Sequence, residues 1–194
     1  MNMETIILAS RSPRRAEILK NAGIPFEVIC ADADETMVKS VTAAELTMGF
    51  ASRKLRAVFD RKGDERLILA ADTVVCRNGE VFGKPKDEDD AERMLTLLSD
   101  GWHEVYTGIA LQKNGRLIID FDVTHVRMRK MEPSEIKAYI KTKEPMDKAG
   151  AYAVQDIGSI FISRLDGSFH NVMGLPISLV CDRLSRDFGI SVLE

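Results

Sequence analysis

The sequence predicts an α/β protein in which helices cover a mixed β-sheet. Short apolar runs typical of strands alternate with amphipathic helical patterns along the 194 residues. Two dipeptides, Asn78-Gly79 and Asn114-Gly115, mark tight hairpin turns. Strand–helix alternation favours parallel neighbours and hairpins require antiparallel ones, so we expect both kinds of pairing. The length suits one domain, which we expect to span residues 1–194.

Compact apolar runs in the first half of the chain predict three strands, at residues 5–9, 26–30 and 67–71. Ser12-Pro13 supplies an N-cap and a first-turn proline for a helix that ends near Gly23. A longer helix begins at Thr42, because Thr42 and Glu45 have the spacing of a capping box. Its apolar stripe consists of Ala44, Met48, Ala51, Leu55 and Val58.

The second half predicts two hairpins, which join residues 74–77 to 80–82 and residues 102–112 to 116–128. Asp87 caps a helix that stops near Gly101, and Pro133 opens another that runs to Thr142. A strand over 159–165 follows a turn-rich stretch. The last helix has one apolar face, made of Ile177, Val180, Cys181, Leu184 and Phe188.

Composition excludes several classes of protein. A net charge of -3 and a pI near 5.7 leave no global basic field for nucleic acid, so any anion site must be local. Three widely spaced cysteines, Cys30, Cys76 and Cys181, fit reduced thiols better than a disulfide framework. The apolar run before Arg11 is too short for a signal peptide or a membrane span. We therefore expect a cytoplasmic protein without a membrane or nucleic-acid partner.

The stretch LASRSPRR places a strand, a tight turn and a helix N-terminus in succession, an arrangement that presents backbone N–H groups to an anion. Arg14 and Arg15 fall in the first helical turn, where the helix dipole disfavours cations unless an anion compensates. Guanidinium groups bind phosphate oxygens in bidentate fashion. The segment predicts a phosphate site, and a solvated basic helix start is the alternative.

Carboxylates follow two of the predicted strands. Asp72 comes directly after LILAA, where open α/β sheets place ligands, so it could hold a divalent cation or polarise a water, or simply cap a turn. Asp32, Asp34 and Glu35 form a second acidic group, which is either a solvated loop or a participant in metal-assisted phosphate chemistry.

Three lysines, Lys54, Lys84 and Lys148, each adjoin a loop or a predicted strand end. Individually they fit surface lysines, which are rarely buried. They indicate an anion-binding site only if the fold brings them together around one anion.

Seven segments, read in order, resemble the Maf family of nucleoside triphosphate pyrophosphatases: LASRSPRR, DE at 34–35, LAADTVV, GKPKD, YTGIAL, EPMDKAGAYAVQ and NVMGLPISL. The resemblance runs from about Leu8 to Leu179. It implies an elongated mixed sheet flanked by helices, two lobes with a central cleft, and similarity to inosine triphosphate pyrophosphatases. It also implies a homodimer and a divalent cation, Mg²⁺ with Mn²⁺ or Co²⁺ as substitutes.

The implied reaction is hydrolysis of a nucleoside triphosphate to the monophosphate and pyrophosphate, with Asp72 as the proton acceptor. We expect Asp72 and Glu35 to be the metal ligands. The expected substrate-binding residues are Ser10, Arg14, Arg15, Glu35, Lys54, Thr73, Lys84 and Gln155. A nucleotide-binding regulator of cell division or stress that does not turn its ligand over is the alternative function.

Gln155 favours one group of substrates. Uracil and thymine present an N3–H donor beside an O4 acceptor, and a carboxamide offers the complementary pair from one side chain. We therefore expect dTTP and UTP as substrates, unless Gln155 only braces its loop. Asp156 stands next to it where the resemblance leads us to expect glycine.

Overall fold

The computed structural model describes residues 4–30, 41–63 and 65–193. In these ranges it contains six α-helices: α1 (Pro13–Asn21), α2 (Ala43–Lys62), α3 (Glu88–Leu98), α4 (Pro133–Lys141), α5 (Phe169–Met173) and α6 (Ile177–Phe188). The strands are β1 (Ile6–Leu8), β2 (Phe26–Val28), β3 (Ile68–Arg77), β4 (Glu80–Phe82), β5 (Trp102–Lys113), β6 (Arg116–Met128) and β7 (Ile162–Asp166). Three 3₁₀ helices follow α4: η1 (Glu144–Asp147), η2 (Ala149–Ala151) and η3 (Ile157–Phe161).

The described strands form one mixed sheet in the order β2-β1-β3-β5-β6-β7, and β4 pairs with β3 beside this path. Strand β1 pairs in parallel with both β2 and β3. The β3–β4 and β6–β7 pairs are antiparallel. The predicted α/β class and the mixed pairing are confirmed.

The chain divides into two compact units that interleave along the sequence. The first unit consists of Met1–Asp72, Thr107–Asp122 and Gly174–Glu194. The second consists of Thr73–Tyr106 and Val123–Met173. Because β3, β5 and β6 each contribute residues to both, neither unit is a continuous stretch of chain.

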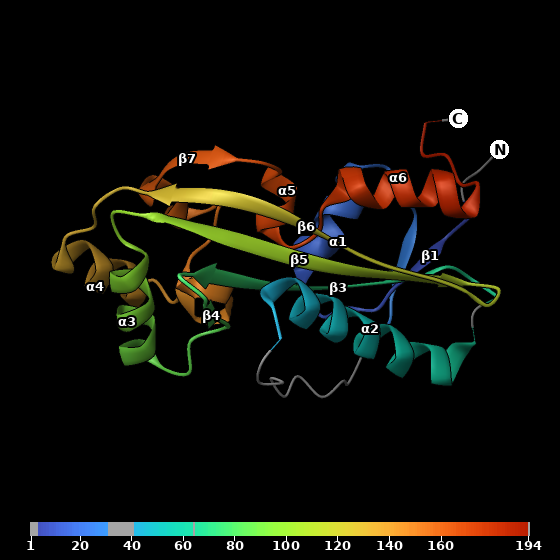
Figure 1. Ribbon diagram of the computed structural model, residues 1–194, viewed down its shortest axis with the longest axis horizontal. Coiled ribbons are helices and arrows are strands. Elements are labelled where there is room, and N and C mark those ends of the chain that lie inside the picture. Colours follow the sequence, from blue (N-terminus) through green and yellow to red (C-terminus); the bar gives the residue numbers. More distant parts are fainter. Residues whose placement is uncertain (1–3, 31–40, 64, 194) are drawn as a thin grey trace. The chain divides into compact units, whose positions relative to one another are not determined.

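In the first unit, α2 and α6 lie on opposite sides of the strands (Figure 1). The stripe of α2, with Ala51, Leu55 and Val58, packs on an apolar surface made of Ile7, Ala9, Ile68, Ala70 and Ala110. Gly108 of β5 permits this close approach. A Cβ atom there would lie 2.4 Å from the carbonyl carbon of Thr47 and 2.5 Å from the nitrogen of Met48, both in the backbone of α2.

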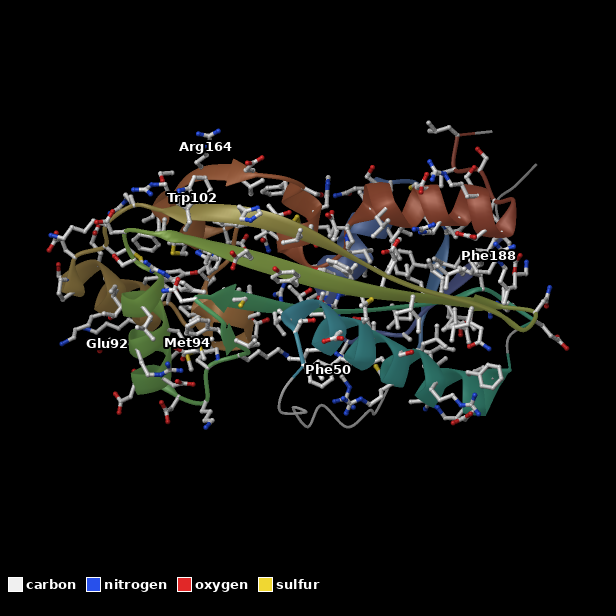
Figure 2. The ribbon with its side chains drawn as sticks, in the orientation of Figure 1. Phe50, Glu92, Met94, Trp102, Arg164 and Phe188 are labelled. Atoms are coloured by element: carbon white, nitrogen blue, oxygen red, sulfur yellow. The ribbon has the colours of Figure 1, made fainter. Side chains whose placement is uncertain are left out.

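The second unit has a core of its own, in which α3 and α4 pack against the strands. Its members include Phe82, Met94, Leu95, Leu98, Val105, Val126, Met128, Ile136, Tyr139, Tyr152 and Phe161. On its surface, the Arg164 guanidinium of β7 lies 5.9 Å from the ring centre of Trp102 at the start of β5 (Figure 2). This contact between a cation and an aromatic face covers part of an otherwise exposed ring.

Short sequence motifs predicted most of the helices and turns correctly. The capping box of α2 is present, since Thr42 Oγ1 accepts from the Glu45 amide and the Glu45 carboxylate accepts from the Thr42 amide. Asp87 caps α3 as predicted. Both hairpins form, with positive φ angles at Asn78 and Gly79 of 51° and 80°, and at Asn114 and Gly115 of 49° and 79°.

Three expectations about elements were wrong. The strand predicted to end at Ala71 continues as β3 to Arg77, so Asp72 lies within the strand and not after it. The strand predicted over 159–165 begins only at Ile162, because η3 occupies the preceding residues. Helix α5 was not expected. Ser12 does occupy the N-cap of α1, but its side chain makes no capping hydrogen bond.

The continuation of β3 has a physical explanation. Beyond its parallel pairing with β1, which ends at Leu69, the strand acquires a new antiparallel partner, β4, at Val75 to Arg77. The β-branched residues Thr73, Val74 and Val75 favour the extended backbone in between. A single polar residue therefore does not end the strand.

Candidate active site

Ser10 follows β1 and is buried, with 4% of its surface exposed. Its hydroxyl oxygen accepts a hydrogen bond from the Ser12 amide at 3.1 Å and from Arg15 Nη1 at 3.2 Å. These two contacts fix the turn between β1 and α1. The predicted phosphate-binding segment is therefore rigidly built at its centre.

The arginines of this segment differ in their surroundings. Arg15 is 8% exposed, and its Nε donates to the carbonyl oxygen of Gly174 at 2.7 Å, which ties α1 to the segment before α6. Arg14 is half-buried and Arg11 is exposed. No acidic side chain stands in the first turn of α1. Arg15 is thus built into the fold through its contacts with Ser10 and Gly174.

Lys54 and Asp72 form an ion pair in the first unit. Lys54 Nζ donates to Asp72 Oδ1, and each side chain is 13% exposed. The apolar stripe of α2 holds the helix on β3, and Lys54 lies next to Ala51 and Leu55 on that helix. The pair places the positive charge of Lys54 beside a largely buried carboxylate on β3.

Thr73 is the next residue of β3 and is half-buried. Because side chains alternate along a strand, Thr73 and Asp72 point to opposite sides of β3. Lys84 lies in the second unit and is exposed. The carbonyl oxygen of its neighbour Gly83 accepts from the Gly150 amide at 3.0 Å, which links the Lys84 turn to η2.

Lys148, just before η2, is more enclosed than a surface lysine. Its side chain is 12% exposed, pairs with Asp147, and donates to the carbonyl oxygen of Glu144 at 3.3 Å. Lys148 therefore takes part in the internal structure of the turn-rich stretch.

Gln155 lies in a segment whose start is deeply buried. The four residues before it, 151–154, are buried, Gln155 is half-buried and Asp156 is exposed. Tyr152 Oη lies 2.8 Å from His103 Nε2, and His103 is 1% exposed. Burial, assisted by the nearby Arg77 charge, lowers the pKa of His103 to about 3, so this imidazole is neutral at physiological pH. Gln155 thus follows a firmly anchored stretch of backbone.

Two further residues contact this segment, and the sequence did not reveal them. Tyr139 and Glu144 hydrogen-bond to backbone amides on either side of Gln155. Tyr139 belongs to the apolar face of α4, and Glu144 stands in the EPMD turn. In the sequence, a tyrosine on an apolar helix face and a glutamate in a turn look like ordinary core and turn residues.

The proposed metal ligands can be assessed only in part, since Glu35, with Asp32 and Asp34, lies outside the described residues. Within the described ranges, no three His, Cys, Asp or Glu side chains gather into a preformed metal site. Asp72 is the one proposed metal ligand that lies within the described residues, and a single carboxylate suits Mg²⁺ where other oxygen ligands complete the coordination.

None of the helices within residues 4–30, 41–63 and 65–193 is long and apolar enough to span a bilayer. The chain is 46% identical to a dTTP/UTP pyrophosphatase of Acetivibrio thermocellus, with 99% of each chain aligned. It is 44% identical to one of Caldicellulosiruptor bescii over 90% of each chain. It is 41% identical to one of Bacillus cereus over 98% of this chain and 93% of the other.

Among solved structures, a nucleoside-triphosphatase (dITP/XTP pyrophosphatase) of Mycobacterium abscessus matches with a TM-score of 0.45 and 13% identity, covering 95% of this chain and 94% of the other. The family model for Maf-like proteins matches residues 5–187, which is nearly the whole chain. With the relatives above, that match shows that the chain belongs to the Maf family.

Proposed function

We propose that this chain is an enzyme that hydrolyses nucleoside triphosphates, with dTTP and UTP as its preferred substrates, to the monophosphate and pyrophosphate. The observation that carries the proposal is the Lys54–Asp72 pair, enclosed in the first unit of a chain 46% identical to a relative named dTTP/UTP pyrophosphatase. A carboxylate beside an ammonium group can activate water and bind phosphate at the same place.

In the proposed reaction, Asp72 accepts a proton from the water that attacks the α-phosphorus. The new bond joins the water oxygen to that phosphorus, the bond from the α-phosphorus to the bridging oxygen breaks, and pyrophosphate leaves. Arg14, Lys54 and Lys84 balance the negative charge of the phosphates. Ser10, held by Arg15, lines the phosphate-binding turn. No covalent enzyme intermediate is required.

A divalent cation, Mg²⁺ with Mn²⁺ or Co²⁺ as substitutes, is part of the proposal. Asp72 and Glu35 are its proposed protein ligands, and when bound it supplies charge neutralisation at the phosphate oxygens. Because Lys54 already contacts Asp72 Oδ1, the lysine and the cation would act on the same carboxylate.

Gln155 is the proposed base-reading residue. Its carboxamide can accept from N3–H and donate to O4 of uracil or thymine, and a base with a different edge leaves a polar group unpaired. Thr73 is proposed to contribute to the same selectivity.

We also propose that the protein is a cytoplasmic homodimer that acts on free nucleotides. The free thiols at Cys30, Cys76 and Cys181 support the cytoplasmic location, and the acidic pI favours free nucleotides over nucleic acid as ligands. The dimer is proposed from membership of the Maf family. Light scattering coupled to gel filtration measures the mass of the particle, and a monomeric mass contradicts the dimer.

The central experiment measures pyrophosphate released from dTTP, UTP, CTP, 7-methyl-GTP and 5-methyl-UTP in the presence of Mg²⁺, with Asp72→Asn as the comparison. We expect dTTP and UTP to be hydrolysed fastest and Asp72→Asn to lower kcat by orders of magnitude while the fold is kept. Near-normal rates in that variant would remove Asp72 from the reaction. Tight nucleotide binding without pyrophosphate release would instead support a regulator that senses triphosphates.

A further inference from the structure

The segment that carries Gln155 is held at both ends by two side chains outside it. The Ala153 amide donates to Tyr139 Oη at 3.1 Å, before Gln155. After Gln155, the Ile157 amide donates to Glu144 Oε2 at 3.1 Å and the Gly158 amide donates to Glu144 Oε1 at 2.9 Å.

The two holding groups are also joined to each other. Tyr139 Oη donates to Glu144 Oε1 at 2.7 Å. Tyr139 is 3% exposed, and its ring packs edge-on against Phe161 with the ring centres 5.3 Å apart. Burial, and then the hydrogen bond to Glu144, raise the pKa of the Tyr139 hydroxyl above its usual range, so it keeps its proton and remains a donor. Tyr139 and Glu144 therefore form one connected clamp, the Tyr139–Glu144 clamp.

The backbone on both sides of Gln155 comes together tightly at Gly158. A Cβ atom on Gly158 would lie 2.4 Å from Tyr139 Oη and 2.7 Å from the carbonyl oxygen of Ala153. The carbonyl oxygen cannot move without moving the segment. The space thus admits only glycine, and the stretch from Ala153 to Gly158 is closed into a compact loop with Gln155 on it.

We propose that Tyr139 and Glu144 are positioning residues that fix the Gln155 backbone and thereby set the selectivity between pyrimidine bases. This inference rests on the proposed function, in which Gln155 reads the base. A carboxamide discriminates between a uracil edge and a cytosine edge only if its orientation is fixed, because a rotated or displaced amide can pair with either. In this proposal the two clamp residues act through the backbone of the segment and do not contact the base.

The decisive variant is Glu144→Gln, which keeps the size of the side chain. An amide has one oxygen and one NH₂ group, so a donor must now face either the Ile157 amide or the pair formed by Tyr139 Oη and the Gly158 amide. Tyr139→Phe is the second variant, since it removes the hydroxyl that contacts Ala153 and Glu144 but keeps the ring that packs on Phe161.

The matched control is Glu135→Gln. Glu135 is also a carboxylate of the second unit that accepts from a backbone amide, that of Glu132 at 2.9 Å, and from a side chain, Arg129. It stands on α4, the helix that carries Tyr139, and its hydrogen bonds go to Arg129 and Glu132, outside the Gln155 segment. Glu135→Gln therefore shows how the loss of a hydrogen-bonded carboxylate affects the stability and activity of the second unit when the Gln155 segment is left intact.

The measurement is kcat and KM for UTP and for CTP, together with the thermal midpoint of each variant. For Glu144→Gln and Tyr139→Phe we expect KM for UTP to rise about tenfold with a smaller change in kcat, since a small misplacement of a contact is enough for such a loss. We expect kcat/KM for CTP to change little, so the UTP-to-CTP ratio falls about tenfold. Glu135→Gln should keep the wild-type ratio.

Two results would overturn the inference. One is a wild-type UTP-to-CTP ratio in both clamp variants, and the other is an equal fall in activity on both substrates together with a lower thermal midpoint, which is the signature of a structural role only. Failure of the proposed function is distinguishable, because in that case the wild-type chain releases no pyrophosphate from UTP, or Gln155→Ala leaves the ratio unchanged.

Discussion

The close approach of α2 to β5 at Gly108 yields a sharp test of how Lys54 is positioned. In Gly108→Ala, the new Cβ would meet the carbonyl carbon of Thr47 at 2.4 Å, where ordinary contact begins at 3.4 Å. The atoms it meets belong to the backbone, so no side chain can rotate away, and α2 must move by about 1 Å. Because overpacking of this kind costs typically about 1–3 kcal/mol, we expect a loss of about 3 kcal/mol in the free energy of unfolding.

Urea unfolding followed by circular dichroism measures this loss, and pyrophosphate release from UTP measures its effect on the site. With a slope of about 2 kcal/mol per molar urea, the midpoint should fall by about 1.5 M. Displacement of α2 also moves Lys54 away from Asp72, so we expect kcat to fall about 10- to 100-fold.

Gly49→Ala is the matched control, since Gly49 also lies in α2 but a Cβ there would meet nothing within 4 Å. It should stabilise the protein by about 0.5–1 kcal/mol, because alanine favours the helix. Wild-type stability and activity in Gly108→Ala, or an equal loss in both variants, would refute the reasoning from close approach.

Three further predictions concern acid, a helix cap and the cation. The folded pKa of His103 is about 3, below its unfolded value near 6.5, so the stability it contributes is complete above pH 6.5 and is lost as pH falls toward 3. His103→Gln should therefore flatten the fall in the free energy of unfolding between pH 6.5 and 4 by about 1.4 kcal/mol per pH unit, as urea titrations at several pH values would show, and an unchanged slope contradicts a neutral buried imidazole. Thr42→Ala should lower the free energy of unfolding by about 1 kcal/mol, as urea titration would show, and a neutral result would mean that the capping box contributes nothing. Removal of divalent cations with EDTA should stop pyrophosphate release without lowering the thermal midpoint, and Mg²⁺ should restore it; undiminished turnover would exclude the metal.

Features encoded in a few neighbouring residues could be predicted from the sequence. The capping box at Thr42, the aspartate cap of α3 and the two asparagine–glycine turns are decided by atoms a few positions apart. Helical spacing also predicted the buried residues Ala51, Leu55 and Val58 of α2. Nearer the start of that helix it was wrong, since Leu46, Thr47 and Phe50 are buried and the predicted Ala44 and Met48 are only half-buried. The fold class therefore followed from the pattern.

Features that depend on distant partners could not be predicted. The end of β3 depends on β4, and the pairing of Lys54 with Asp72 depends on how α2 lies on the sheet. Arg15 reaches Gly174, which is 159 residues away. Glu144 looks like any turn acid until the backbone amides of the Gln155 segment are seen around it. Such contacts are decided by tertiary packing, which one sequence does not display.

The interleaving of the two units has a consequence for synthesis on the ribosome. Once residue 173 has been made, all of the second unit exists, whereas the first still lacks its last segment, Gly174–Glu194. That segment brings α6 and the carbonyl group that receives the Arg15 side chain. The unit that is begun first is thus completed after the second one, and the Arg15 side chain meets its carbonyl partner only once Gly174 has been made.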